Sequence, residues 1–75
     1  MLGTVKWFKD DRGWGFLRPN DGGPEAFVHH HDILMDGHRT LSTGQPVEYD
    51  VRPAEKGLQA FNVRPLGPAP SAGER

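Results

Sequence analysis

Two aromatic residues alternate with two glycines directly after an arginine in the segment RGWGFL, residues 12–17. Successive side chains of a strand point to opposite faces, so Trp14, Phe16 and Arg18 share one face. Leu17 lies on the other face and is the one ordinary core residue of the segment. Rings beside a cation on an exposed face suit a single-stranded nucleic acid, because bases stack on the rings and phosphates pair with Lys or Arg.

These rings admit a second interpretation, in which they are ordinary core residues of a small β-barrel. Aromatic residues and glycines alternate in many barrels that bind nothing. The neighbouring cations favour the exposed position, because burial of an arginine is costly. The pattern of this segment alone leaves both interpretations open.

Short runs rich in aromatic and β-branched residues lie between closely spaced turn signals, such as NDGGP at 20–24 and STG at 42–44. This spacing is typical of an all-β sandwich or barrel. Within a single domain of this size, the runs predict five strands, at about residues 3–9, 13–19, 25–30, 46–52 and 58–64.

Two of these runs alternate between apolar and polar residues, which predicts their inward faces. Val47, Tyr49 and Val51 are expected to face the core from one strand. Phe61 and Val63 are expected to face it from the last strand.

The segments outside the strands predict little regular structure. HDILMDG, residues 31–37, is expected to form a single helical turn that places Ile33 or Leu34 in the core. From residue 65 the sequence PLGPAPSAGER has no periodicity, which is typical of a disordered tail. We therefore predict one domain over residues 1–66 and a flexible tail over residues 67–75.

Composition limits the classes of function. The 75 residues include no cysteine, which excludes a disulfide framework and a thiolate site. The net charge is −1, yet residues 1–18 and 51–75 each carry +2 while residues 19–50 carry −5. A face shared by the two basic segments would attract polyanions with modest, salt-dependent affinity. We see no signal peptide and no apolar stretch of membrane-spanning length, so we expect a cytoplasmic protein with no membrane partner.

Several motifs, in order and spacing, resemble the cold-shock domain family. They are KWF at 6–8, RGWGFL at 12–17, AFVHH at 26–30, TLSTGQPVEYDV at 40–51 and GLQAFNV at 57–63. The resemblance spans residues 2–64 and implies a five-stranded antiparallel OB-fold barrel. It also implies binding of single-stranded RNA and DNA, preferably pyrimidine-rich, and an RNA chaperone activity. The short strands leave open whether the protein is a monomer or a strand-swapped dimer.

The family's motifs, together with the cations beside them, predict the nucleic-acid-binding residues of this chain. Trp14 and Phe16 match the exposed rings of the first motif. Glu25 falls where an acid often meets a base edge. The full predicted set is Lys6, Trp7, Phe8, Lys9, Arg12, Trp14, Phe16, Glu25, Phe27, His29, His30, His38 and Lys56.

Some positions depart from the family or from simple alternation. His30 and His38 stand where the family usually has aromatic residues, and they offer less stacking surface. Strict alternation would turn Trp7 inward with Val5, whereas the resemblance places it on the binding surface, which requires a twist or bulge.

A core departure concerns the size of two side chains. Phe61 is larger than the family's usual small residue, while Ala26 is smaller than its usual valine. We expect the two to compensate in core volume.

Rival functions have weaker support. The run HHH at 29–31, with His38, could bind a metal ion through imidazole nitrogens. Adjacent residues of a strand point to opposite faces, so we expect no physiological metal site and no cofactor. Ser42 and Ser71 have no base arranged around them, so we predict no catalytic residue and no enzyme. A barrel that binds a peptide on the same aromatic face remains the alternative.

Overall fold

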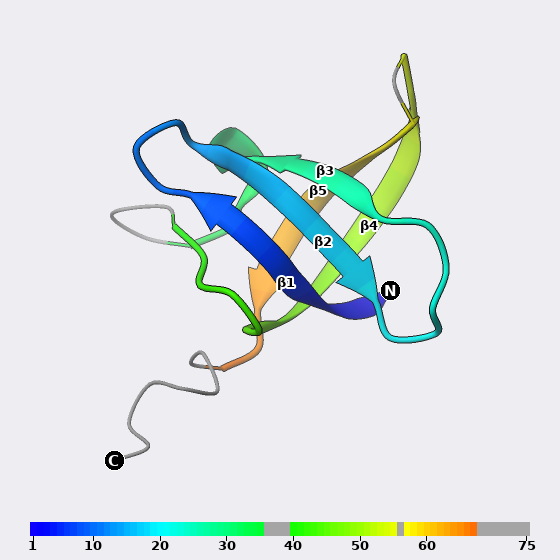
Figure 1. Ribbon diagram of the computed structural model, residues 1–75, viewed down its shortest axis with the longest axis horizontal. Helices are drawn as coiled ribbons and strands as arrows, with labels where there is room; N and C mark the ends of the chain where they lie inside the picture. Colours follow the sequence, from blue (N-terminus) through cyan, green and yellow to red (C-terminus); the bar gives the residue numbers. More distant parts are fainter. Residues whose placement is uncertain (36–39, 56, 68–75) are drawn as a thin grey trace.

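Five strands close into a barrel in the spatial order β1-β2-β3-β5-β4 in the computed structural model (Figure 1). The structure describes residues 1–35, 40–55 and 57–67. The strands are β1 (Leu2–Lys9), β2 (Trp14–Pro19), β3 (Ala26–His29), β4 (Pro46–Ala54) and β5 (Gly57–Pro65). This confirms the all-β barrel and all five predicted strands.

Four of the five strand pairings are antiparallel, as expected for the fold. The exception is the pairing of β3 with β5, which is parallel and places Ala26 opposite Leu58 and Phe27 opposite Gln59. This pairing joins the β1–β2–β3 sheet to the β4–β5 hairpin. It therefore brings two distant parts of the chain together beside β3.

The core fills the barrel with aliphatic residues and one tyrosine. Leu17, Val47 and Tyr49 are almost completely buried, as the alternation predicted, and Val51 packs against them. The buried set is Val5, Leu17, Ala26, Val28, Ile33, Leu41, Val47, Tyr49, Ala60 and Val63.

The prediction that Phe61 fills the core is wrong. Asp50 pairs with Phe61 and Glu48 pairs with Arg64, so two residues of β5 lie opposite Tyr49. This bulge contains Asn62, whose φ is 52°, and it shifts the inward face by one residue. Ala60 and Val63 point inward instead. Phe61 stays partly exposed, with the Arg52 guanidinium 4.9 Å from its ring centroid, so it does not compensate for Ala26.

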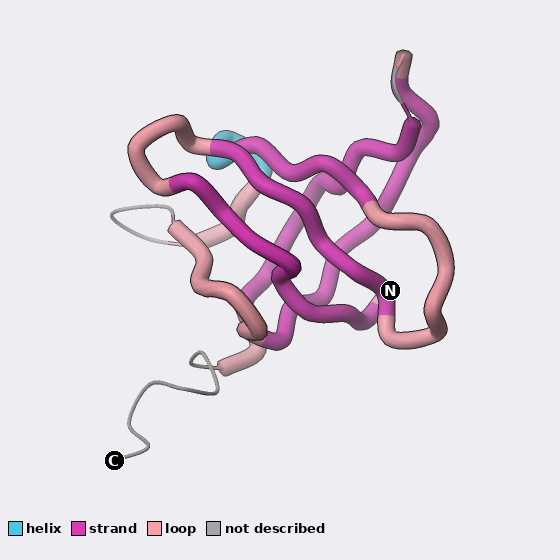
Figure 2. Tube along the Cα trace, viewed as in Figure 1, coloured by secondary structure: helices cyan, strands magenta, loops and turns pink. Residues whose placement is uncertain are grey.

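The chain leaves β3 through the short 3-10 helix η1 (His30–Asp32), shown in cyan in Figure 2. Ile33 follows it, forms a bridge with Val63 and is buried, whereas Leu34 is half-exposed. The predicted helical turn and the inward Ile33 are therefore confirmed. Apart from Gly67, whose carbonyl accepts a bond from Gln45, the predicted tail lies outside the described residues. No helix in the described ranges is long and apolar enough to cross a membrane.

Candidate functional site

Four half-exposed rings form one continuous surface across β1, β2 and β3, which we call the aromatic face: Trp7, Trp14, Phe16 and Phe27. The Trp7 centroid lies 5.2 Å from that of Trp14 and 5.3 Å from that of Phe16. Phe27 lies 5.7 Å from Trp14 and 5.8 Å from Phe16. These are ordinary distances for interacting rings, so the four side chains hold one another in place while their outer surfaces meet solvent.

Trp7 reaches this face because β1 contains a bulge. Val5 lies opposite Leu17, while Trp7 lies opposite Phe16, so Lys6 is an extra residue in the ladder. The inward face changes by one residue at this point. Val5 therefore points into the core and Trp7 points outward, which confirms the bulge that the family resemblance required.

Gly15 lets the paired strands β1 and β2 approach each other closely beneath the rings. A Cβ atom at Gly15 would overlap the Trp7 carbonyl oxygen and lie 2.7 Å from the Phe8 Cα. Only glycine fits this approach without a shift of the backbone. The glycine between the two rings of β2 is thus required by the close approach of the paired strands β1 and β2.

Phe8 is not part of the aromatic face. It lies opposite Gly15 in the ladder and packs against the core on the inner side of the sheet. The structure therefore does not bring this predicted residue together with the other rings.

Cations lie at the edge of the aromatic face. The Lys9 ammonium is 5.6 Å from the Trp7 ring centroid. Lys6 donates to Glu25 at 3.1 Å, and Arg18 lies 3.6 Å from the other carboxylate oxygen. Glu25 therefore holds two cations at the side of the face, and all three side chains remain partly exposed. Arg12, in the β1–β2 turn, is also exposed.

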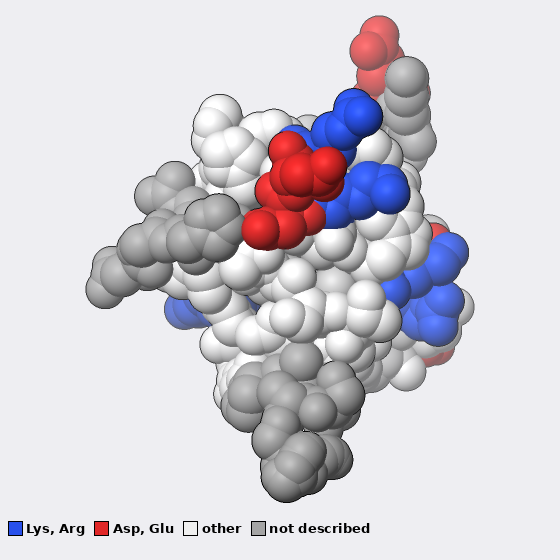
Figure 3. Space-filling view, turned by 60° about the vertical axis from the view of Figure 1, so that its left-hand side comes forward, with Lys and Arg blue, Asp and Glu red and all other residues white. Residues whose placement is uncertain are grey.

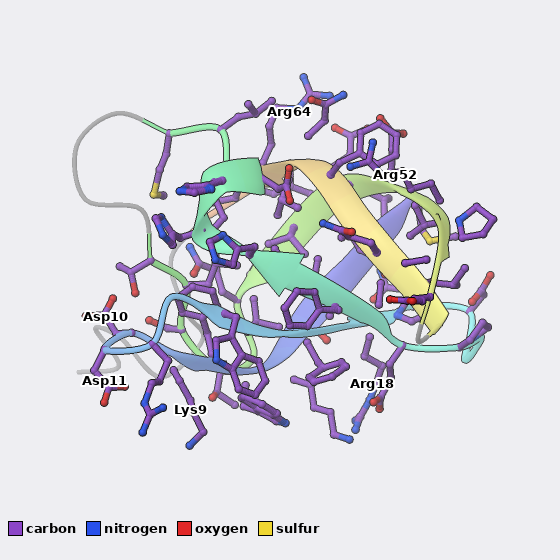
Figure 4. All side chains as sticks on the ribbon, turned by 90° about the horizontal axis from the view of Figure 1, so that it is seen from above. Lys9, Asp10, Asp11, Arg18, Arg52 and Arg64 are labelled. Atoms are coloured by element: carbon purple, nitrogen blue, oxygen red, sulfur yellow. The ribbon has the colours of Figure 1, made fainter. Side chains whose placement is uncertain are left out.

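In the part of the chain that the structure describes, the cations of the two basic segments do not share one face. In Figure 4, Lys9 and Arg18 project from one side of the barrel, whereas Arg52 and Arg64 project from the opposite side. Arg64 also lies 3.6 Å from Glu48. Positive and negative side chains are also adjacent elsewhere on the surface, because Figure 3 shows Lys and Arg side chains beside Asp and Glu. Within residues 1–35, 40–55 and 57–67, the cations beside the aromatic face are thus Lys6, Lys9, Arg12 and Arg18.

A groove of about 620 Å³ adjoins the aromatic face, between β2–β3 and the β4–β5 hairpin. Trp14, Phe16, Phe27 and Glu25 form one wall. The other wall is formed by Ala54, Glu55, Gly57, Leu58 and Gln59.

Sequence reasoning missed Leu58 and Gln59 as residues of the site. Their position follows from the parallel β3–β5 pairing, which places Gln59 opposite Phe27. No short-range pattern predicts that pairing. The resemblance to a closed five-stranded barrel is the one signal that could have found them.

The three described histidines, His29, His30 and His31, lie at the end of the aromatic face. His29 is opposite Trp14 in the β2–β3 ladder. The expectation that adjacent histidines diverge is wrong, because β3 ends at His29 and the chain turns into η1. The ring centroids of His29, His30 and His31 are 4.3–4.6 Å apart. His38 and Lys56, also predicted to bind, lie outside the described residues.

Comparison with known proteins gives consistent matches. Residues 1–66 match the family model described as 'Cold-shock' DNA-binding domain. Cold shock-like protein CspA of Stigmatella aurantiaca is 55% identical over 64 residues, which cover 85% of this chain and 94% of that protein. Cold shock-like protein CspD of Escherichia coli is 47% identical, covering 85% of this chain and 86% of that protein.

A solved structure described as Drosophila Unr CSD456 has the same fold. It superposes with a TM-score of 0.70 at 31% identity. The match covers 89% of this chain but only 26% of the Drosophila chain.

Proposed function

Because this chain belongs to the cold-shock DNA-binding domain family, whose members bind nucleic acids and are not enzymes, we propose that it binds single-stranded RNA and DNA by stacking bases on the aromatic face. The observation that carries the proposal is the set of four contacting, half-exposed rings on β1–β3. An exposed aromatic surface of this kind lowers the solubility of a folded protein, so it indicates a binding role. Base stacking on such rings contributes about 1–3 kcal/mol of binding free energy per base.

Charged side chains have separate roles in this proposal. Lys9 and Arg12 contact phosphates beside the rings, and Lys6 and Arg18 do so from the edge that Glu25 organises. The Glu25 carboxylate lines the groove, where it can accept a hydrogen bond from a base edge. Contacts from Phe8, His29, His30, His38 and Lys56 remain predictions from the resemblance.

An RNA chaperone activity follows from the same surface. Bases are available for stacking only when they are unpaired, so binding favours the open form of a stem-loop by mass action. A preference for pyrimidine-rich strands and a cytoplasmic location are also part of the proposal, and both are supported by family membership.

The experiment compares two phenylalanine variants that differ in position. We expect Phe27→Ala to weaken binding of a labelled oligothymidine at least fivefold, because one stacking platform is lost. Phe61→Ala is the matched control, since Phe61 is also a partly exposed ring but lies outside the aromatic face. Fluorescence anisotropy gives the affinities, and circular dichroism checks that both variants are folded.

Different nucleic acids test the preference for single strands and the chaperone activity separately. Wild-type protein should bind the single strand more tightly than a duplex of the same sequence, and it should open a labelled RNA stem-loop. Equal losses of affinity in the two variants would show that the aromatic face is not the binding surface.

A further inference from the structure

We infer that His29, His30 and His31 form a binding site for one divalent metal ion of the zinc, nickel and copper class. Each histidine offers one ring nitrogen, and these three nitrogens all lie within 4.8 Å of one another. Neutral imidazole is the nitrogen ligand that these ions favour. The inference is independent of nucleic-acid binding, because it depends only on the geometry at the end of β3.

The fold gathers three rings that an extended strand would separate. β3 ends at His29, and η1 begins at His30. The His30 amide donates to the Gly13 carbonyl at 2.8 Å, and the Ile33 amide donates to the His30 carbonyl at 3.2 Å. Backbone bonds on both sides thus fix the turn, so the rings are brought together before any ion arrives.

The nitrogens need only a small adjustment to bind. Zinc–imidazole bonds of about 2.0–2.1 Å in a tetrahedral site place ligand nitrogens about 3.4 Å apart. The widest separation here, 4.8 Å, must therefore shorten by about 1.4 Å, which is within the reach of a ring rotation. His31 is exposed and can supply most of that movement.

Metal binding displaces a hydrogen bond at His29. The His31 amide donates to His29 Nδ1 at 3.3 Å, which is a long bond. An ion at Nδ1 replaces it, and an ion at Nε2 moves the ring proton to Nδ1, which then cannot accept. The loss of a bond this long opposes metal binding only weakly, because three imidazole–metal bonds form in return.

Three protein ligands leave the fourth tetrahedral position open. The three histidines lie at the end of the aromatic face, because His29 is opposite Trp14 in the ladder. The open position is available to water or to another oxygen ligand.

The test measures the melting temperature with and without ZnCl2, and zinc affinity by calorimetry. The rise in melting temperature separates a folded site from a mere run of histidines, because an ion stabilises the fold only when it binds the folded chain more tightly. We expect zinc to raise the melting temperature of wild-type protein, and a chelator to reverse the rise.

Two variants identify the ligands. His31→Gln removes an exposed ring and should lower zinc affinity at least tenfold while abolishing the rise in melting temperature. His38→Gln is the matched control, because His38 is the remaining histidine of the chain, and it should leave the zinc affinity within twofold of wild type.

Three results would overturn the inference. The first is a wild-type melting temperature that zinc leaves unchanged or lowers. The second is a rise that survives in His31→Gln. The third is a loss of zinc affinity in His38→Gln as large as the loss expected for His31→Gln. The melting temperatures of both variants without metal show that they are folded.

Discussion

Tyr49 is the residue whose environment is least typical of a small barrel core. Its side chain is 1% exposed, and its hydroxyl is the one buried side-chain polar atom in the described ranges without a hydrogen-bond partner. Burial, with a smaller contribution from the charge of Asp21, raises the pKa of Tyr49 above 10.0. A buried hydroxyl without a partner reduces stability, typically by about 1–3 kcal/mol.

We expect Tyr49→Phe to raise the free energy of unfolding by about 1 kcal/mol at neutral pH, because it removes that hydroxyl and keeps the ring. Urea unfolding followed by tryptophan fluorescence measures the change. A loss of stability would show instead that the hydroxyl has a partner.

The same residue predicts a pH dependence. The folded pKa lies above the unfolded value, so the folded state holds this proton more tightly. Its contribution to stability is complete below about pH 10 and is lost as the pH rises from there through the folded pKa. Wild-type stability should therefore fall more steeply than that of Tyr49→Phe above pH 10, and parallel curves would contradict this.

At the scale of elements, two bulges decide which side chains face the core. Simple alternation correctly placed Trp14, Phe16 and Leu17, because β2 is regular. It failed for Trp7 in β1 and for Phe61 in β5, where each strand has one extra residue in its ladder. A bulge depends on the partner strand as well as on the bulged residues, so the alternation pattern of one strand cannot reveal it.

Gly15 lies where the paired strands β1 and β2 approach each other too closely for a side chain. A Cβ atom there would meet backbone atoms of Trp7 and Phe8, which cannot rotate away. We expect Gly15→Ala to lower the free energy of unfolding by about 1–3 kcal/mol, a typical cost of overpacking. Urea unfolding measures this loss.

Gly67→Ala is the control for that substitution, because its added Cβ would lie 4.0 Å from the nearest atom, the Pro46 Cγ. It should change stability by less than about 0.5 kcal/mol. An equal effect of the two substitutions would mean that the close approach of β1 and β2 at Gly15 does not limit the fold.

At the scale of the whole molecule, a nearly neutral protein can still bind a polyanion when a few cations lie where the bases stack. The net charge is −1, and Arg64 and Arg52 lie on the side of the barrel away from Lys9 and Arg18. Lys6, Lys9, Arg12 and Arg18 should therefore contact about three to four phosphates, which gives a log–log salt slope of about −2 to −3 for a single strand. Charge counts by segment could not predict this, since the barrel places Arg52 and Arg64 of the second basic segment away from Lys9 and Arg18 of the first.

The most direct test of base stacking on the aromatic face is quenching of tryptophan fluorescence by a short oligothymidine. Both tryptophans of the chain, Trp7 and Trp14, belong to that face, so the signal reports on it alone. We expect strong quenching on saturation and an affinity that falls about tenfold or more when NaCl rises from about 50 to about 200 mM. Absence of quenching at micromolar oligothymidine would contradict the account. Quenching with an affinity independent of salt would contradict the phosphate contacts.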